Sequence, residues 1–200
     1  ADPETRKQAL QELSNNDPSL LELAQRDPDP AVRRAALERL VDFDLLQGIA
    51  NSDADASIRV AAQNRQWSLL TGKVTDSPSL AYRLERLRHS QDIELVEFLL
   101  HQAVEPELRL AALERIESEA SLAKIAVQDP HQELRLAALE RISDPELLDQ
   151  ISRQSRNRDK RLHRRARERL DALIDARSRI DRVEQLCTEM EQLPWDGESG

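Results

Sequence analysis

The stretch from Leu108 to Ile116 reads LRLAALERI, and the same nine letters return from Leu134 to Ile142. A third copy, VRRAALERL, runs from Val32 to Leu40. Degraded copies bring the total to seven: Thr5 to Leu13, Ile58 to Gln66, Ser79 to Leu87 and Leu162 to Leu170. Self-similarity of this kind is typical of repeat architectures, in which each copy is one structural unit.

An arginine at the second position of the copies sets the period. It is present at Arg6, Arg33, Arg59, Arg109 and Arg135. The successive intervals are 27, 26, 50 and 26 residues. A degraded copy must therefore lie inside the interval of 50.

The copy at 79–87 fills this interval but departs from the pattern. It carries Leu80 where other copies carry arginine, as the last copy carries His163. It also follows a polar stretch, 71–79, that contains Gly72. Because glycine and polar residues favour a turn, we expect a bend or an offset here, with Trp67 filling the resulting gap.

A shorter apolar segment with helical i, i+3, i+4 spacing precedes most copies. Several of these segments begin with Asp-Pro, as at Asp17-Pro18 and Asp144-Pro145. This pair predicts an N-cap followed by proline in the first helical turn. Each unit is thus expected to be helix, tight turn, helix, and such units bury their apolar faces only by stacking.

The repeated arginine is expected to point inward. At about 100° per residue, Arg33 falls on the apolar arc of its helix, and a buried guanidinium needs an acceptor. The turn acids Asp29, Asp55 and Glu105 are the expected acceptors. The predicted ladder, which links repeat to repeat, consists of Arg33, Arg59, Arg109 and Arg135. A row of arginines that binds a ligand is the alternative.

Helix–turn–helix units with the pattern D-x-x-x-x-V-R and a following A-A-L resemble HEAT repeats, specifically the short bacterial kind. The resemblance covers about residues 3 to 170. It implies an all-α, right-handed solenoid whose second helices line a concave surface. The period of 26 to 29 residues is shorter than the roughly 40–47 residues of long HEAT units, so short helices are expected.

The sequence predicts one long helix over 159–193, which follows the repeat array of 1–158 and precedes a flexible tail, 194–200. Its apolar residues form a narrow stripe close to heptad spacing, which is typical of a coiled coil, and a dimer through this helix is one expectation. This order resembles the N-terminal region of large bacterial proteins that continue into coiled-coil domains of unknown function. The resemblance implies that the chain is a fragment.

Composition and motifs argue against catalysis. The chain has four glycines and no phosphate-binding or nucleophile-elbow motif, and its four histidines lack partners at zinc-ligand spacing. We therefore expect no enzyme activity, no metal and no cofactor. Cys187, between Glu184 and Glu191, is expected to be packed and inert. A single cysteine and the absence of an apolar membrane-spanning run suggest a cytoplasmic protein without a membrane contact.

A basic cluster lies at 153–169, within a chain of net charge −9. Two interpretations are open: a cationic end that contacts phosphates of RNA or DNA, or a capping repeat whose polar outer face keeps the array soluble. In a variant of the second interpretation, these arginines pair with acids of a further domain. The candidate phosphate-binding residues are Arg153, Arg156, Arg158, Lys160, Arg161, Arg164 and Arg165.

The outer positions of the repeated helices suggest a second site. Leu110 and Leu136 are apolar on a face that should be wet, and Glu114 and Glu140 border them. A partner helix or peptide with apolar and basic residues would fit such a face, although isolated surface leucines need no explanation. The sequence thus favours a non-catalytic protein–protein interaction scaffold, with an RNA- or DNA-associated adaptor as the alternative.

Overall fold

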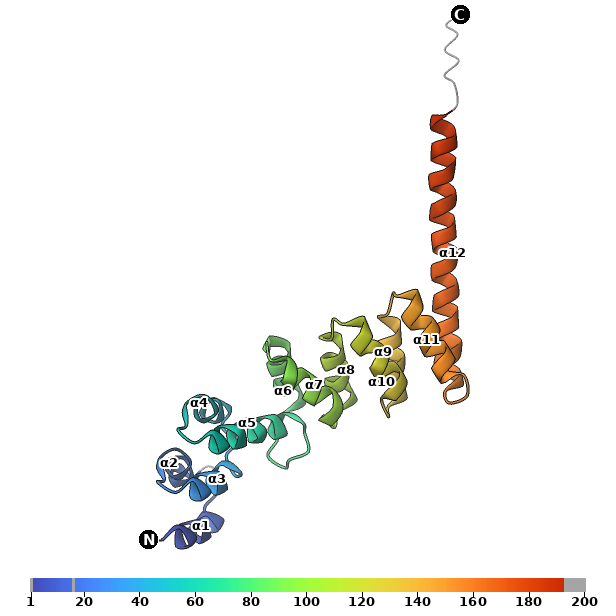
Figure 1. The fold of residues 1–200 in the computed structure, drawn as a ribbon. Coiled ribbons are helices and arrows are strands. Elements are labelled where there is room, and N and C mark those ends of the chain that lie inside the picture. The colour runs from blue at the N-terminus through green and yellow to red at the C-terminus, as the bar shows by residue number, and fades with distance from the viewer. Residues whose placement is uncertain (1, 16, 193–200) are drawn as a thin grey trace, which may run out of the picture. The chain divides into compact units, whose positions relative to one another are not determined.

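The computed structural model describes residues 2–15 and 17–192, and within these ranges it contains twelve α-helices and no strand (Figure 1). The all-α prediction is therefore confirmed for this part of the chain. The predicted tail, 194–200, lies outside the described residues.

The helices form two compact units, which divide between Arg115 and Ile116. The first contains α1 (Pro3–Glu12), α2 (Pro18–Arg26), α3 (Pro30–Leu37), α4 (Phe43–Ser52), α5 (Ala56–Leu70), α6 (Leu80–His89), α7 (Ile93–Gln102) and α8 (Pro106–Glu114). The second contains α9 (Glu119–Gln128), α10 (Gln132–Glu140), α11 (Pro145–Ser155) and α12 (Lys160–Glu191). Because α12 packs against α11, the long helix belongs to the same unit as the repeats before it.

Aspartate side chains start many of these helices. Asp17 accepts a hydrogen bond from the backbone N–H of Ser19 at 2.8 Å, and Asp144 accepts one from that of Glu146 at 2.8 Å. A proline follows each aspartate in the first turn, where its missing N–H leaves no helical bond unmade. The predicted Asp-Pro caps of α2 and α11 are confirmed.

The repeated positions of the sequence form the core of both units. An apolar residue before the arginine position is buried, as in Val32, Ile58, Leu108, Leu134 and Leu162. An alanine three residues after the arginine position has no exposed surface, as in Ala36, Ala62, Ala112, Ala138 and Ala166. Large residues fill the space between the helices, and alanines allow close approach. In the first unit α2 packs on α3, α4 on α5 and α7 on α8; in the second, α9 packs on α10 and on α11.

This pairing is interrupted between α5 and α7, in the first unit. α5 runs for 15 residues and contacts α7, and a loop, 71–79, leads directly to α6. Gly72 in this loop adopts a φ of 79°, a left-handed conformation that suits glycine. The ring of Trp67 lies 5.2 Å from that of Phe98. The predicted bend or offset in the stacking stays a prediction, whereas Trp67, which was expected to fill a gap here, packs against Phe98.

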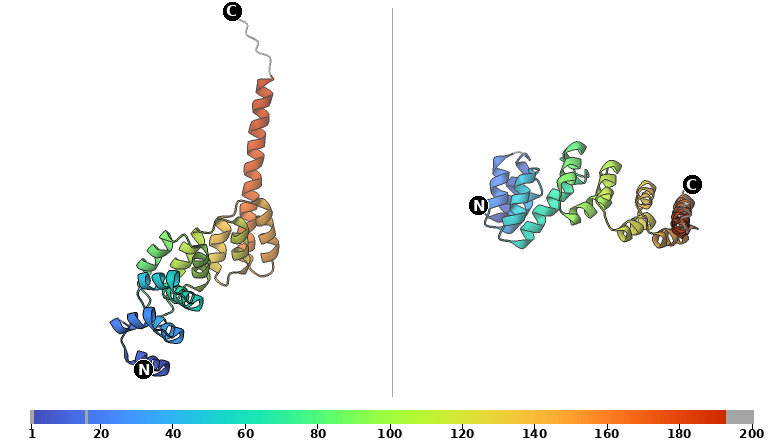
Figure 2. Two further views of the ribbon diagram at one scale, coloured as in Figure 1. Left: turned by 60° about the vertical axis from the view of Figure 1, so that its left-hand side comes forward. Right: turned by 90° about the horizontal axis from the view of Figure 1, so that it is seen from above.

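α12 is 32 residues long, or about 48 Å at 1.5 Å per residue, which confirms the predicted long C-terminal helix. Its first part is packed through Leu162, Ala166 and Leu170. Beyond Leu170 the helix extends past its neighbours α9 to α11 (Figure 2). Cys187 is exposed, so the expectation of a packed cysteine was wrong. No helix of the described residues has both the length and the hydrophobicity to cross a bilayer.

Candidate functional site

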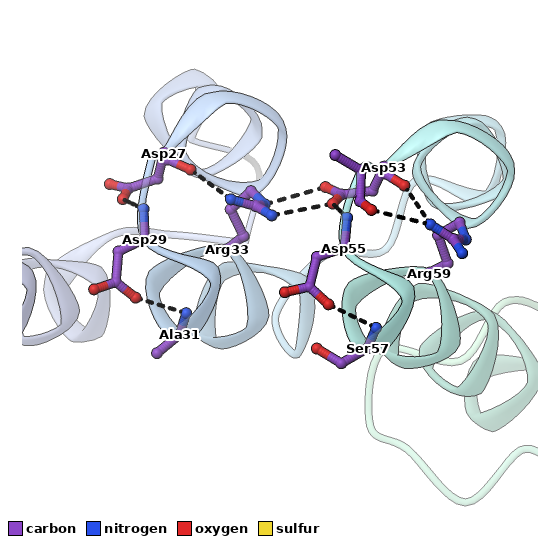
Figure 3. A network of polar contacts seen from close by, with 9 residues as sticks. Asp27, Asp29, Ala31, Arg33, Asp53, Asp55, Ser57 and Arg59 are labelled. Carbon is purple, nitrogen blue, oxygen red and sulfur yellow. Dashed lines mark hydrogen bonds and ion pairs between the residues drawn. The ribbon is translucent and has the colours of Figure 1, made fainter.

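The guanidinium of Arg33, on α3, bridges two turns (Figure 3). Its Nε and Nη2 donate to the two carboxylate oxygens of Asp53 at 3.1 and 3.0 Å, and its Nη1 donates to the backbone oxygen of Asp27 at 2.9 Å. The side chains of Arg33 and Asp53 are 11% and 7% exposed. Two parallel, charge-assisted bonds are the strong form of an arginine–carboxylate contact. This contact ties the α2–α3 turn to the α4–α5 turn.

Asp27 and Asp53 also make a hydrogen bond within their own turns. Oδ1 of Asp53 accepts the N–H of Asp55 at 2.8 Å, and Oδ1 of Asp27 accepts that of Asp29 at 2.9 Å. Oδ2 of Asp27 also accepts a hydrogen bond from Nε of Arg6, at 2.7 Å. The hydrogen bond from this guanidinium lowers the pKa of Asp27 below its ordinary value, although burial opposes the shift. One carboxylate thus shapes its turn and binds the arginine of the preceding copy.

Asp29 and Asp55, which the sequence suggested as guanidinium acceptors, instead cap the helices that follow them. Asp29 accepts the backbone N–H of Ala31, and Asp55 accepts that of Ser57, each at 2.8 Å (Figure 3). A capping carboxylate must face the first turn of its own helix. In these two turns the acid that binds the arginine, Asp27 or Asp53, lies two residues earlier, so the expected role of Asp29 and Asp55 was wrong. Glu105, the third expected acceptor, does bind a guanidinium, but that of Arg83.

Arg83 is the arginine of the copy that seemed to lack one. It follows Ser79, the N-cap of α6, by four residues, the spacing that separates cap and arginine in the other copies. Its Nη1 and Nη2 bind the carboxylate of Glu105 at 2.6 and 2.5 Å. The alignment that placed Leu80 at the arginine position was three residues out of register. Hydrogen bonds from Arg83 lower the pKa of Glu105 below its ordinary value of 4.5.

Gly72 lies directly against this ion pair. A Cβ atom at position 72 would lie 2.7 Å from Oε2 of Glu105 and would also overlap the guanidinium of Arg83. The positive φ of Gly72 independently disfavours any other residue. The loop 71–79 thus depends on glycine both for its conformation and for the space that the pair needs.

The other predicted ladder arginines bind turns in two ways. Arg59 and Arg109 each donate through Nη1 to two backbone carbonyls of the turn before their own helix. Arg135 makes the same contacts, and its Nη2 lies 2.9 Å from Oδ2 of Asp159. All of these contacts are made to the protein itself, which favours a structural role over ligand binding.

A second set of arginines, which sequence reasoning missed, follows the first by six residues. Each donates to a backbone carbonyl near the end of the repeated helix one copy earlier. The donors are Arg39, Arg65, Arg115, Arg141 and Arg169, and their acceptors are Leu13, Leu40, Leu87, Ile116 and Ile142. The last carbonyls of a helix have no partner within the helix, so these arginines satisfy them. The fixed interval of six was visible in the sequence.

The predicted partner-binding residues lie on α8 and α10. Leu110 and Leu136 are half-buried, whereas Glu114 and Glu140 are exposed. Glu140 is already paired, because its carboxylate oxygens lie 2.5 Å from Nε of Arg165 and 3.0 Å from Nη1 of Arg169. The hydrogen bond from Arg165 lowers the pKa of Glu140 below its ordinary value. Glu140 is therefore a weaker candidate for a partner contact than Glu114.

A groove of about 810 Å³ opens on the equivalent face of the first unit, over α3, α5 and the loop 71–79. Its lining includes Arg34, Glu38, Val60, Asn64 and Val74. The first four occupy the same positions in their copies as the residues predicted on α8 and α10. Val60 is 54% exposed. This groove was not predicted, because one wall is the loop 71–79.

The lining of the groove mixes apolar side chains, such as Val60 and Val74, with polar and charged ones. Arg65 lies there, and its Nε donates to the backbone oxygen of Leu40 at 2.9 Å. Burial lowers the pKa of Arg65, an effect that the carboxylates of Asp76 and Glu38 oppose. Asp76 also accepts a hydrogen bond from the side chain of Asn15 at 2.8 Å, which positions the loop. A site of this kind suits a peptide segment better than a small apolar ligand.

The basic cluster of 153–169 is partly neutralised. Five members have a carboxylate within 3.6 Å or less: Arg153, Arg164, Arg165, Arg167 and Arg169. The other four, Arg156, Arg158, Lys160 and Arg161, are exposed and have no ion pair within the described part of the chain. They lie at the α11–α12 turn. The predicted phosphate-binding set is thereby reduced to these four cations.

Comparisons extend this description little. Neither family models, nor curated proteins, nor solved structures gave a match to the chain. No group of three or more metal-ligating side chains occurs among the residues that the structure describes. The groove over α3 and α5 and the basic turn between α11 and α12 are therefore the two candidate sites of the described chain.

Proposed function

We propose that the chain is a non-catalytic interaction scaffold, built as a solenoid of short HEAT-like repeats, and that the groove over α3 and α5 binds a segment of a protein partner. The groove itself is the observation that carries the proposal. It lies on repeated helices, at positions where a packing role would require buried apolar residues, yet Arg34, Glu38 and Val60 are exposed there. Helical and extended segments bind such grooves through a few apolar anchors.

The lining defines the partner segment. Val60 and Val74 offer an apolar surface, which an aliphatic or aromatic side chain of the partner covers. Arg34 on α3 and Glu38, the C-cap of this helix, stand one helical turn apart, and both are exposed. A segment with one apolar anchor flanked by an acidic and a basic residue satisfies all of these groups, and opposite charges set its direction.

Site-specific photocrosslinking tests this proposal. With p-benzoylphenylalanine at position 60 of the intact parent protein, we expect a discrete crosslinked product in cells of the source organism. Position 104 provides the control, because Val104 is also an exposed valine, 50% exposed, and lies outside the groove lining. We expect little product there.

A charge change separates specific binding from chance contact. Asn64→Lys, introduced together with the crosslinker at position 60, should reduce the product at least about tenfold, the effect of losing 1.4 kcal/mol of binding. Equal labelling at positions 60 and 104, or labelling that Asn64→Lys leaves unchanged, would show that the groove is not the binding site.

A second candidate, binding of RNA or DNA, is favoured by the four cations at the α11–α12 turn, for which the described residues provide no carboxylate partner. If they contact phosphates, reversal of Arg158, Lys160 and Arg161 to glutamate should abolish binding to a single-stranded oligonucleotide, measured by fluorescence anisotropy. Wild-type binding should weaken steeply with added salt.

The matched control reverses three exposed cations elsewhere, Arg26, Arg88 and Lys124, and changes the net charge by the same amount. Loss of binding only in the α11–α12 variant supports this second function. An equal loss in both variants would show that binding depends on overall charge and not on the α11–α12 turn. Absence of wild-type binding at low salt would exclude nucleic-acid binding.

A further inference from the structure

The second half of α12 carries an apolar stripe that is exposed in the described residues except at Leu173, which is half-buried. In the part of α12 that follows Leu170, three aliphatic residues are more than half exposed: Ile180 at 52%, Val183 at 59% and Met190 at 70%. Exposed aliphatic residues scattered singly are common, but these belong to a regular series. The series consists of Leu173, Ala176, Ile180, Val183, Cys187 and Met190.

The spacing of this series is 3, 4, 3, 4 and 3 residues, the a and d positions of a heptad repeat. An ideal helix has 3.6 residues per turn, so only a partner helix keeps a stripe with a period of 3.5 buried along its length. Positions 173, 180 and 187 are a positions, and positions 176, 183 and 190 are d positions. The stripe thus has the pattern of one strand of a coiled coil.

The charges along α12 indicate the partner. In the register that buries the whole stripe of an antiparallel pair, residues 183–192 of one helix face residues 171–180 of the other. Residues 183–192 contain three acidic and no basic side chains, whereas residues 171–180 contain two acidic and two basic side chains. A parallel pair would instead set the two acidic segments side by side, which is unfavourable. The helix macrodipoles add a small contribution of the same sign.

We propose that α12 forms an antiparallel two-stranded coiled coil with a second copy of this chain. In the register that buries the whole stripe, Leu173 faces the partner's Met190, Ala176 faces the partner's Cys187, and Ile180 faces the partner's Val183. Each layer therefore matches residues of similar size. Flanking e positions bring Arg177 toward the partner's Glu184, and the twofold symmetry forms this pair twice.

The contact covers 173–190, about 27 Å of helix at 1.5 Å per residue. Two and a half heptads with one alanine and one cysteine per helix make a weak coiled coil, so association depends on protein concentration. The inference does not depend on the groove over α3 and α5, because it concerns another helix in the other unit.

Sedimentation velocity tests the association. We expect the chain to shift from monomer toward dimer as its concentration rises to about 200 µM. Ile180→Glu with Val183→Glu should weaken this association at least about tenfold, since each buried charge costs more than 1.4 kcal/mol. Both positions are exposed in the single chain, so its folding should not change. Ser178→Glu with Gln185→Glu adds the same charge on the opposite side and should leave the association intact.

Disulfide crosslinking tests the direction. In the antiparallel pair Cys187 is 11 residues from its counterpart, roughly 16 Å along the axis, which is too far for a disulfide. The wild type should therefore remain uncrosslinked under mild oxidation, whereas Ala176→Cys, which retains Cys187, should form a covalent dimer. Adding Cys187→Ser to Ala176→Cys should abolish that dimer.

Two outcomes would overturn the proposal. Rapid crosslinking of the wild type through Cys187, or of the Ala176→Cys, Cys187→Ser variant, would show a parallel pair. A monomer at every concentration, with no crosslinking in Ala176→Cys, would show that a second copy does not cover the stripe.

Discussion

Arg83→Leu should destabilise the first unit by about 3 kcal/mol, the lower end of the cost of removing one partner from a buried ion pair. The lower end applies because the side chain of Glu105 is 28% exposed, whereas that of Arg83 is only 5% exposed. The substitution leaves the Glu105 carboxylate without its cation and removes a bond from Nε of Arg83 to the backbone oxygen of Pro78. Urea unfolding followed by Trp67 fluorescence, in a Trp195→Phe background, measures the change.

Arg88→Leu is the matched control on the same helix. Arg88 is exposed and pairs with Glu85 across one helical turn, so its removal should cost less than about 0.5 kcal/mol. In a double-mutant cycle, Glu105→Gln should restore part of the loss caused by Arg83→Leu, because no buried charge then remains unpaired. If Arg83→Leu and Arg88→Leu are equally stable, Arg83 is not an essential link.

The pH dependence checks the same pair. Arg83 lowers the pKa of Glu105 below its ordinary value of 4.5, so the folded state holds this carboxylate ionised more strongly than the unfolded state does. The resulting stabilisation is complete above pH 4.5 and is lost as the pH falls through the lowered pKa. The stability difference between the wild type and Arg83→Leu should therefore narrow below pH 4.5.

Asp159→Ala should destabilise the second unit by about 3 kcal/mol, as a sum of two losses. About 1 kcal/mol comes from the N-cap of α12, where Oδ1 accepts the backbone N–H groups of Arg161 and Leu162 at 3.1 and 3.0 Å. About 2 kcal/mol comes from the half-buried pair with Arg135. Hydrogen exchange in peptides that cover 132–170 measures the change within this unit.

Asp159→Asn separates the two losses, because asparagine is as good an N-cap as aspartate but carries no charge. It should retain the cap and lose only the ion pair, so its stability should lie between those of the wild type and Asp159→Ala. Equal stability of the two variants would mean that the cap contributes nothing.

Helix positions were predictable from sequence because their determinants are local. Asp17 and Asp144 precede prolines, and the apolar residues after them recur at helical spacing, so caps and helices follow from neighbouring residues alone. The pairing partners were not predictable in the same way. An angle on a helical wheel gives the direction of Arg33, but it does not show that Asp53 lies nearer than the capping Asp55.

Arg83 was missed because the residues around it changed. The copies around Arg33, Arg59, Arg109 and Arg135 have an aliphatic residue before the arginine and an alanine three residues after it, whereas this copy has Tyr82 and Arg86. The structure explains both: the ring of Tyr82 packs at 5.5 Å from that of Phe43, and the guanidinium of Arg86 lies 5.6 Å above the Phe43 ring. An aromatic contact replaced the aliphatic one, and letter similarity alone could not recover the register.

The site was predicted on the correct face of the repeated helices, but the groove lies in other copies. The outer positions follow from the period of the repeat. The groove is also lined by Val74 of the loop 71–79, and this loop makes a tertiary contact between Asp76 and the distant Asn15. A contact across 61 residues leaves no trace in a local pattern.

The second set of arginines has an evolutionary consequence. Arg65 and Arg141 donate to backbone oxygens, which every amino acid supplies. This contact, the joint between successive copies, therefore does not require a particular side chain in the neighbouring copy. A gene that duplicates one copy therefore also supplies a working joint, with no compensating mutation in the adjacent copy. Divergence can then alter the outer residues, such as Val60 and Leu110, while the joint is preserved.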